Sequence, residues 1–217
     1  LLPPQCVGCQ QMGAWLCDAC QQRAARVAPP FCTRCGDAIA TGELCPRCQA
    51  TPLRLDCVRS VFYFEGVVRD TIHEFKYNGV TVLAEPLSDL MARYWHDHPL
   101  PADVLVPVAL HKARLRERGY NQAELLARAL GRRIGLPVNT ATLVRQRATA
   151  PQVELDMQER KRNVEGAFEV YGQELTGRKV LLLDDVCTTA ATLDACAAAL
   201  RDGGVESVAA LTLARAR

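Results

Sequence analysis

Two adjacent carboxylates, Asp184 and Asp185, follow four apolar residues and precede small and hydroxylated residues in the stretch VLLLDDVCTTAATL, residues 180–193. The apolar run predicts a buried strand, and the residues from Thr188 onwards predict the start of a helix. Backbone N–H groups at a helix N-terminus favour anions such as phosphate. Two acids beside such a turn suit the vicinal hydroxyls of a sugar, which predicts a site for a ribose 5-phosphate. The alternative is a strand end followed by an ordinary helix cap.

Eight of the eleven cysteines lie in the first 48 residues, as four pairs with two residues inside each pair. Two such pairs complete a tetrahedral zinc site at about 2.3 Å per sulfur. We therefore expect two structural zinc ions, with the pairs joined sequentially or, alternatively, in crossed order; disulfides suit a cytosolic protein poorly. Sequential pairing gives one tetrad of Cys6, Cys9, Cys17 and Cys20 and another of Cys32, Cys35, Cys45 and Cys48. The other three, Cys57, Cys187 and Cys196, are expected to be ordinary buried residues.

The composition of the 217-residue chain changes near QATPLRLD, residues 49–56, which we expect to be a linker. Before it, residues 1–50 predict a small double zinc ribbon with too few large apolar residues for a core of its own. After it, in residues 57–217, strand-like and helix-like segments alternate. This alternation predicts a parallel α/β sheet flanked by helices, and ligands of such sheets bind beyond the carboxyl ends of the strands.

Apolar periodicity places the individual elements. Short continuous apolar runs indicate strands, and apolar residues three and four positions apart indicate helices that end at glycine. Strands are expected at 57–64, 103–110, 180–183 and 207–214, and helices at 68–75, 87–95, 121–135 and 188–204.

The positive charge of the chain is concentrated in one stretch. The net charge is +2, but residues 111–162 hold twelve Lys or Arg and five Asp or Glu, so that 12 − 5 gives a local charge of +7. Such a stretch is either a solvated basic face or a surface for phosphate groups or nucleic acid. No apolar run approaches the roughly 20 residues of a membrane span. We therefore expect a cytoplasmic protein without a membrane span.

Several motifs resemble known families. The stretch around DDVCTTAAT resembles the signature of the type I phosphoribosyltransferases, which bind phosphoribosyl pyrophosphate (PRPP), although Ala190 stands where glycine is usual. The blocks VPVALHKARLRERGYNQAELLA and RQRATAPQVELDMQERKRNVEGAF, with FKYNG and the cysteine-rich N-terminus, resemble the ComF family of competence-associated phosphoribosyltransferase homologues, which includes GntX-like proteins. The resemblance spans essentially the whole chain. If position 190 needs a positive φ, alanine costs on the order of 1 kcal/mol there.

The resemblance implies roles for particular residues. Asp184 and Asp185 would bind the ribose hydroxyls as the catalytic acids, and the loop of Thr188, Thr189, Ala190, Ala191 and Thr192 would hold the 5′-phosphate. Pyrophosphate would bind in the loop after Pro107, Mg²⁺ would bridge it to the ribose, and a mobile loop would close over the sugar. The candidates for the pyrophosphate loop are His111, Lys112, Arg114 and Arg118, and those for the mobile loop are Arg145, Arg147, Thr149 and Gln152.

Three further polar residues near these motifs have less specific roles. Lys76 in FKYNG is either another phosphate contact or a solvated lysine at the C-terminus of a helix. Asn121 and Gln122 are expected to cap the following helix and to need no ligand role.

Two functions of different classes fit the sequence. The first is a Mg²⁺-dependent phosphoribosyltransferase, whose acceptor the sequence does not predict. The second is a non-catalytic zinc-ribbon protein that binds nucleic acid or serves as a scaffold and keeps the fold without turnover. The resemblance implies a link to DNA uptake in natural competence, with single-stranded DNA and a helicase-like protein as partners. Aromatic residues for base stacking are few in the basic stretch, where Tyr120 is the main one.

Overall fold

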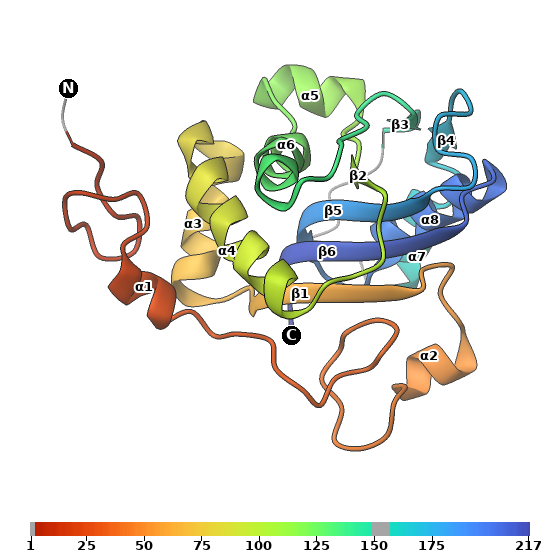
Figure 1. The fold of residues 1–217 in the computed structure, drawn as a ribbon, viewed down its shortest axis with the longest axis horizontal. Helices are drawn as coiled ribbons and strands as arrows, with labels where there is room; N and C mark the ends of the chain where they lie inside the picture. Colours follow the sequence, from red (N-terminus) through yellow and green to blue (C-terminus); the bar gives the residue numbers. More distant parts are fainter. Residues whose placement is uncertain (1–2, 149–156) are drawn as a thin grey trace.

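The computed structural model describes residues 3–148 and 157–217, and its centre is a four-stranded parallel sheet with the order β1-β6-β5-β2 (Figure 1). These strands are β1 (Cys57–Tyr63), β2 (Val104–Pro107), β5 (Lys179–Cys187) and β6 (Ser207–Arg215). A separate antiparallel pair is formed by β3 (Leu143–Arg145) and β4 (Phe168–Val170). The strands at the centre of the sheet, β5 and β6, are mostly apolar because both faces of the sheet are covered.

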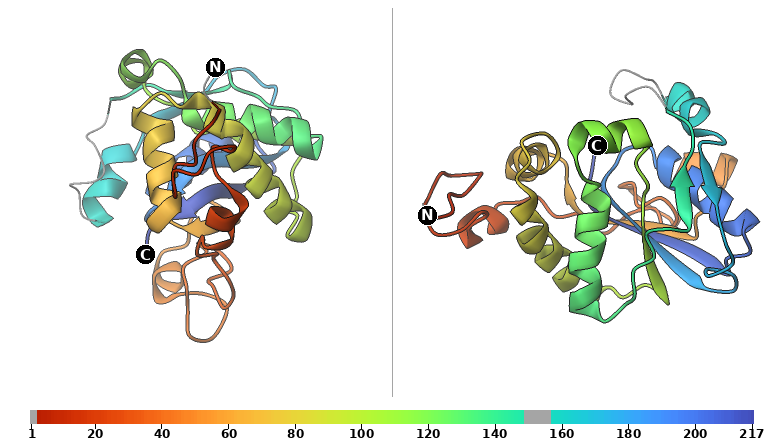
Figure 2. Two further views of the ribbon diagram at one scale, coloured as in Figure 1. Left: turned by 90° about the vertical axis from the view of Figure 1, so that its left-hand side faces the viewer. Right: turned by 90° about the horizontal axis from the view of Figure 1, so that it is seen from above.

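Helices cover the sheet on its two faces. Three of them, α3, α4 and α6, pack on one face, whereas α8 covers the other with α7 against it (Figures 1 and 2). Alternation along β5 supplies both cores, since Leu181 and Leu183 belong to the first and Val180 and Leu182 to the second. The helices of this part of the chain are α3 (Gly66–Tyr77), the 3₁₀ turn η1 (Thr81–Leu83), α4 (Ala84–Asp97), α5 (Lys112–Arg118), α6 (Gln122–Ile134), α7 (Met157–Val164) and α8 (Ala191–Asp202).

The expected strands and helices are confirmed, with differences at their ends. The strand expected at 180–183 extends through Cys187, so both acids lie inside β5 and not after it. Helix α6 begins where the side chain of Asn121 accepts the N–H of Ala123 at 3.0 Å, which confirms the predicted cap, and it ends at Gly135. Residues 112–118, expected in a loop, form helix α5, capped by His111 Nδ1, which accepts the N–H of Ala113.

The N-terminal segment forms two ribbons of similar build. The first ribbon, residues 5–22, opens with a bridge between Gln5 and Met12 and ends with α1 (Asp18–Gln22). The second ribbon, residues 31–50, opens with a bridge between Phe31 and Ala38 and ends with α2 (Pro46–Ala50). The segment between them pairs with β1, since Val27 N–H donates to the carbonyl of Val61 at 3.1 Å. The edge of the sheet formed by β1 is therefore covered.

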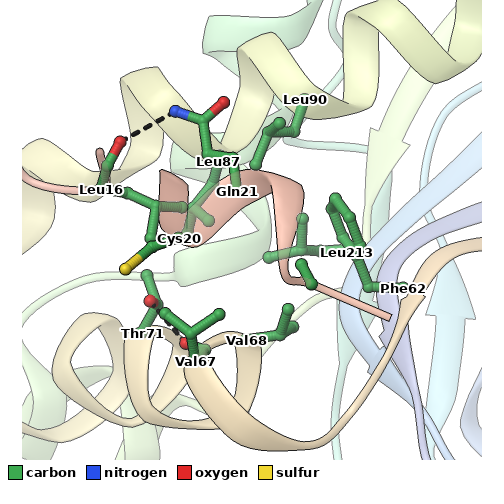
Figure 3. A pocket seen from close by; sticks show the side chains of 11 residues that line it. Leu16, Cys20, Gln21, Phe62, Val67, Val68, Thr71, Leu87, Leu90 and Leu213 are labelled. Carbon is green, nitrogen blue, oxygen red and sulfur yellow. Dashed lines mark hydrogen bonds between the residues drawn. The ribbon is translucent and has the colours of Figure 1, made fainter. Parts of the chain in front are cut away.

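The first ribbon packs against α3 and α4. Figure 3 shows Leu16 and Cys20 facing Val67 of α3 and Leu87 of α4, with a cavity between them of about 10 Å³, enough for no ligand larger than one water. The backbone at Gly8 packs so closely against the side chain of Val67 that a Cβ added to Gly8 would lie 2.5 Å from a methyl carbon of Val67. This ribbon is thus part of the main core.

No helix within the residues that the structure describes is both long enough and apolar enough to cross a membrane.

Candidate functional site

The two acids near the carboxyl end of β5 have different surroundings. Asp185 is buried, with 2% of its surface exposed, and Asp184 is half-buried. Lys76 Nζ of α3 lies 2.5 Å from Asp185 Oδ2, and Gln122 Nε2 of α6 donates to Asp185 Oδ1 at 3.4 Å. Asp184 Oδ1 instead accepts the N–H of Asp185 at 2.8 Å. One acid is therefore anchored by side chains of two helices, whereas the other bonds to its own strand.

These surroundings drive the pKa values of the two acids apart. Burial, followed by the charge of Asp185, raises the pKa of Asp184 well above its usual value. Burial would also raise the pKa of Asp185, but the charge of Lys76 and the hydrogen bonds to the carboxylate outweigh it and lower that pKa. Burial opposes the charge of Lys76, yet the two aspartates raise its pKa. Asp185 and Lys76 thus form an ion pair, and Asp184 is the acid that takes up a proton more readily.

The solvated alternative for Lys76 is wrong, because its side chain is only 19% exposed and is bonded to Asp185. Lys76 lies four residues after Ile72 and eight after Val68, both of which are buried. It therefore continues the inward-facing stripe of α3, and a charge on that stripe needs a buried partner.

Gln122, expected to have no ligand role, lies at the centre of a hydrogen-bonded chain. Its Oε1 accepts from Arg118 Nη1 at 2.5 Å while its Nε2 donates to Asp185. The guanidinium of Arg118 lies 5.3 Å from the centre of the Tyr77 ring. The predicted cap at Gln122 is wrong, and the sequence held a signal for its inward position, since it precedes Leu126 of the buried stripe of α6 by one helical turn.

The loop after β5 makes a left-handed turn at Ala190, with φ 63° and ψ 6°. This is the position where the family signature has glycine, and its φ is positive, so the condition under which alanine is unfavourable there is met. The carbonyl of Ala190 accepts the first i→i+4 bond of α8, from Asp194 N–H at 2.8 Å. The N–H groups of the first turn carry the positive end of the helix dipole. The half-buried side chains of this turn are Thr188, Thr189, Ala191 and Thr192.

The charge of Arg145 in β3 interacts with that of Asp184. The half-buried guanidinium of Arg145 lies 5.3 Å from the centre of the Phe168 ring. Burial lowers the pKa of Arg145, whereas the negative charge of Asp184 raises it. The positive charges of Arg147 and Arg114 lower it further, so Asp184, Arg147 and Arg114 each lie within electrostatic reach of Arg145. Arg147 also donates to the carbonyl of Glu165 at 2.6 Å.

The remaining candidates for the pyrophosphate and mobile loops lie on helix α5 or outside the described residues. Lys112 is exposed on α5, and Arg114 pairs there with Glu117 at 2.9 Å. Thr149 and Gln152 fall outside the described residues.

The eight cysteines of the ribbons form two groups, and in each group the four sulfurs lie within 4.8 Å of one another. The groups are Cys6, Cys9, Cys17, Cys20 and Cys32, Cys35, Cys45, Cys48, so the sequential pairing is confirmed. Backbone N–H groups bonded to the sulfur of Cys6 lower its pKa to about 6 despite burial, and the same holds for Cys32. Burial instead raises the pKa of Cys20, Cys35 and Cys48 in the absence of a metal. Four cysteine sulfurs this close together are the ligand set of a structural zinc ion, so both tetrads fit a zinc ion.

Comparisons with known proteins assign the family. Residues 1–49 match the model of the double zinc ribbon domain, and residues 115–217 match that of the phosphoribosyl transferase domain. Competence protein F of Haemophilus influenzae is 30% identical over 210 residues, which make up 93% of this chain and 90% of that protein. The chain belongs to the ComF family. The resemblance noted in the sequence is thereby confirmed, together with the phosphoribosyltransferase-like fold and the zinc ribbon.

Other members of the ComF family are similar over most of their length. DNA utilization protein YhgH of Escherichia coli K12 is 32% identical, covering 94% of this chain and 92% of that protein. Competence protein ComFC of Bacillus subtilis 168 is 29% identical, covering 92% of this chain and 84% of that protein. Among solved structures, glutamine PRPP amidotransferase from B. subtilis matches with a TM-score of 0.45 and 16% identity over 64% of this chain and 30% of that chain. This likeness is too distant to bear on the ligand.

Proposed function

We propose that this ComF-family chain binds PRPP at the carboxyl edge of its sheet, with the ribose hydroxyls on Asp184 and Asp185 and the 5′-phosphate in the loop of residues 188–192. The observation that carries the proposal is the two acids at the end of β5, followed directly by a left-handed turn that opens α8. Carboxylates accept hydrogen bonds from hydroxyls, and the N-terminus of a helix favours a phosphate. A ligand that carries both groups one sugar ring apart fits this arrangement.

The cations of β3 and α5 suit the diphosphate of the same ligand. We assign the diphosphate contacts to Arg145, whose charge interacts with that of Asp184, to Arg147 and Arg114, whose charges act on Arg145, and to Lys112 at the start of α5. Arg118 and Lys76 are engaged with Gln122 and Asp185, so we assign them a supporting role beneath the acids. Bound Mg²⁺ would supply further neutralisation of the diphosphate. We assign the metal to Asp184, because the charge of Asp185 is already compensated by Lys76.

Transfer of the phosphoribosyl group is the reaction that these proposed contacts would support. The bond between C1′ and the pyrophosphate oxygen breaks, the bonding pair leaves with pyrophosphate, and the acceptor forms a new bond at C1′. The arginines stabilise the charge that develops on the leaving pyrophosphate. The acids, bonded to the ribose hydroxyls, stabilise the positive charge that develops on the ring.

Calorimetry tests this function. The zinc-loaded chain is titrated with PRPP, ribose 5-phosphate and pyrophosphate, each with and without Mg²⁺. We expect PRPP to bind with Mg²⁺, and Asp184→Asn to weaken it at least about tenfold, which corresponds to one charged hydrogen bond. Asp89→Asn, which removes an exposed acid of α4 paired with Arg93, is the matched control and leaves binding unchanged. Absence of PRPP binding, or equal affinity in Asp184→Asn, contradicts the proposal.

A second candidate function is binding of single-stranded DNA, favoured by helix α5 and Tyr77. None of the seven residues of α5 is buried, and Lys112 and Arg116 are exposed on it. The ring of Tyr77 is 65% exposed and lies beside Arg118, which suits stacking with a base. Other arginines of the basic stretch are paired with acids, namely Arg114, Arg128, Arg132 and Arg133.

This DNA-binding role would agree with the names of the relatives. We further propose a helicase-like protein as partner. The reduced cysteines of the two tetrads suit a reducing compartment such as the cytoplasm. Fluorescence anisotropy with a single-stranded oligonucleotide tests it. We expect the affinity to fall steeply with rising salt and to drop in Tyr77→Ala. Tyr171→Ala is the matched control, because Tyr171 is also an exposed tyrosine but follows β4 and belongs neither to α3 nor to α5.

A further inference from the structure

Arg47 of the second ribbon reaches the phosphate loop. It lies between two cysteines of the second tetrad, Cys45 and Cys48, yet its Nη1 donates to the carbonyl of Thr189 at 3.2 Å, across 142 positions of the sequence. The same guanidinium donates to Asp37 Oδ2 at 2.8 Å and is hydrogen-bonded to the sulfur of Cys35, another member of that tetrad. One side chain therefore joins the cysteine cluster to the loop.

The second ribbon is fixed to the strand ends that carry the loop. Arg215 of β6 is 2% exposed, and its Nη1 donates to the carbonyl of Cys35 at 2.9 Å while its Nη2 pairs with Asp37. Asp37 thus bridges two guanidinium groups. In the sheet, Arg215 lies in register with Cys187, the last residue of β5. The ribbon approaches β1 so closely that a Cβ on Gly36, which has φ 75°, would lie 2.7 Å from the carbonyl oxygen of Val58.

These contacts fix one particular peptide group of the loop. In a trans peptide the carbonyl and the following N–H point in opposite directions. The carbonyl of Thr189 points to Arg47, and the N–H of Ala190 is hydrogen-bonded to the sulfur of Cys187 on the other side. The plane of this peptide helps to set φ of Ala190. An alanine left without such restraints favours a negative φ, which would turn the start of α8 away from its present course.

The linker fastens α8 independently of Arg47. The N–H of Arg54 donates to Asp194 in the first turn of α8 at 2.5 Å, and Arg201 near its end pairs with Asp56 at 2.6 Å. Removal of the Arg47 side chain would therefore release the Thr189–Ala190 peptide while the ribbon stays attached along the helix.

We propose that Arg47 is a positioning residue for the phosphate loop: it holds the Thr189–Ala190 peptide in the orientation that the 5′-phosphate requires and so links the second cysteine tetrad to ligand affinity. This inference rests on the proposed PRPP site. It gives the second ribbon a part in ligand binding that the first ribbon lacks.

The first ribbon provides the matched control. Arg23 Nη2 donates to the sulfur of Cys20 at 3.0 Å, so it contacts a tetrad sulfur just as Arg47 contacts Cys35. Arg23 is exposed, and its ribbon packs on α3 and α4, away from the loop. Arg23→Ala thus removes the same kind of contact without touching residue 189.

The experiment compares Arg47→Ala, Arg47→Lys and Arg23→Ala by zinc content, by hydrogen exchange of the ligand-free protein and by PRPP affinity with Mg²⁺. We expect two zinc ions in every variant. In Arg47→Ala we expect faster exchange confined to residues 188–192 and PRPP affinity reduced about tenfold, the loss of one charge-assisted hydrogen bond. Arg47→Lys keeps one cationic donor, so it should restore part of the protection of residues 188–192 from exchange and part of the PRPP affinity. Arg23→Ala should match the wild type in both measurements.

Three results would separate the alternatives. If Arg47→Ala and Arg23→Ala agree in exchange and in affinity, the inference is wrong. If Arg47→Ala loses a zinc ion, Arg47 stabilises the tetrad and the positioning role is likewise rejected. If the wild type binds no PRPP, the proposed function fails together with the claim about affinity, whereas the exchange comparison still decides whether Arg47 holds the loop.

Discussion

Lys76 Nζ at the end of α3 and the carboxylate of Asp185 in β5 form an ion pair at 2.5 Å, with side chains 19% and 2% exposed. Removing one member of a buried pair leaves the other charge without compensation, which is more costly than losing an exposed pair. Lys76 is thus tied to the acids and is not a free surface cation.

Lys76→Met should therefore destabilise the fold. We expect the free energy of unfolding at pH 8 to fall by about 2–3 kcal/mol, below the full value for a buried pair because Lys76 retains some exposure. The lowered pKa of Asp185 means that its ionised form stabilises the fold above the usual carboxyl range and that this contribution disappears as pH falls through the lowered value. The deficit of the variant should shrink in acid. Urea unfolding at several pH values measures this loss of stability, and Arg93→Met, which breaks an exposed ion pair, is the control. Equal losses of unfolding free energy in the two variants would contradict the claim that the Lys76–Asp185 pair is buried and stabilising.

Asp184→Asn should stabilise the fold while weakening the ligand. Burial raises the pKa of Asp184, so its charge is unfavourable in the folded state and the wild type loses stability as pH rises through that value. An amide avoids this loss. We expect the melting temperature at pH 8 to rise by about 2–4 °C, with a smaller difference in acid, where Asp184 is protonated. Differential scanning calorimetry at two pH values measures this; a variant less stable than the wild type at pH 8 would contradict the assignment.

Ala190→Gly should relieve backbone strain. Ala190 has φ 63°, a conformation that costs alanine about 1–2 kcal/mol. Glycine does not have this steric cost, but it loses more backbone entropy on folding, so only part of the cost is recovered. We expect a gain of about 0.5–1 kcal/mol in the free energy of unfolding. PRPP titration of the same variant shows whether the methyl group also affects the pocket, and Ala195→Gly in the interior of α8 is the control, which should lose stability.

Loss of either zinc should have unequal effects on ligand binding. Cys9→Ser breaks the first tetrad, which packs on α3 and α4, whereas Cys48→Ser breaks the second, which holds Arg47. We expect one zinc ion per chain in each variant and a clear reduction of PRPP affinity in Cys48→Ser only. Zinc release measured with a chromogenic chelator, combined with calorimetry, tests this. Equal affinities in the two variants would show that the tetrads do not differ in their effect on the loop.

Much of the fold was predictable because apolar periodicity determined it locally. The runs around Val104 and Leu181 predicted strands, and Asn121 and Gly135 marked both ends of α6. Helix α5 was not expected, because none of its residues is buried and it has no apolar stripe to reveal it.

Only those parts of the site that are contiguous in the sequence could be predicted. The acids and the turn at Ala190 are contiguous and carry a recognisable pattern. The cap predicted at Gln122 and the solvated alternative for Lys76 are wrong, although each residue continues a buried stripe on which a polar residue indicates a buried partner. The contact of Arg47 with Thr189 joins residues 142 positions apart, and no local pattern predicts which cation reaches a distant carbonyl.

The most direct test of the PRPP site is a crystal structure of the zinc-loaded chain with Mg²⁺ and PRPP. We expect density for the 5′-phosphate on the backbone N–H groups of residues 188–192, with the ribose hydroxyls within hydrogen-bonding distance of Asp184 and Asp185 and the Lys76–Asp185 pair retained. Density for the ligand elsewhere on the protein, or none at saturating PRPP, would contradict the site.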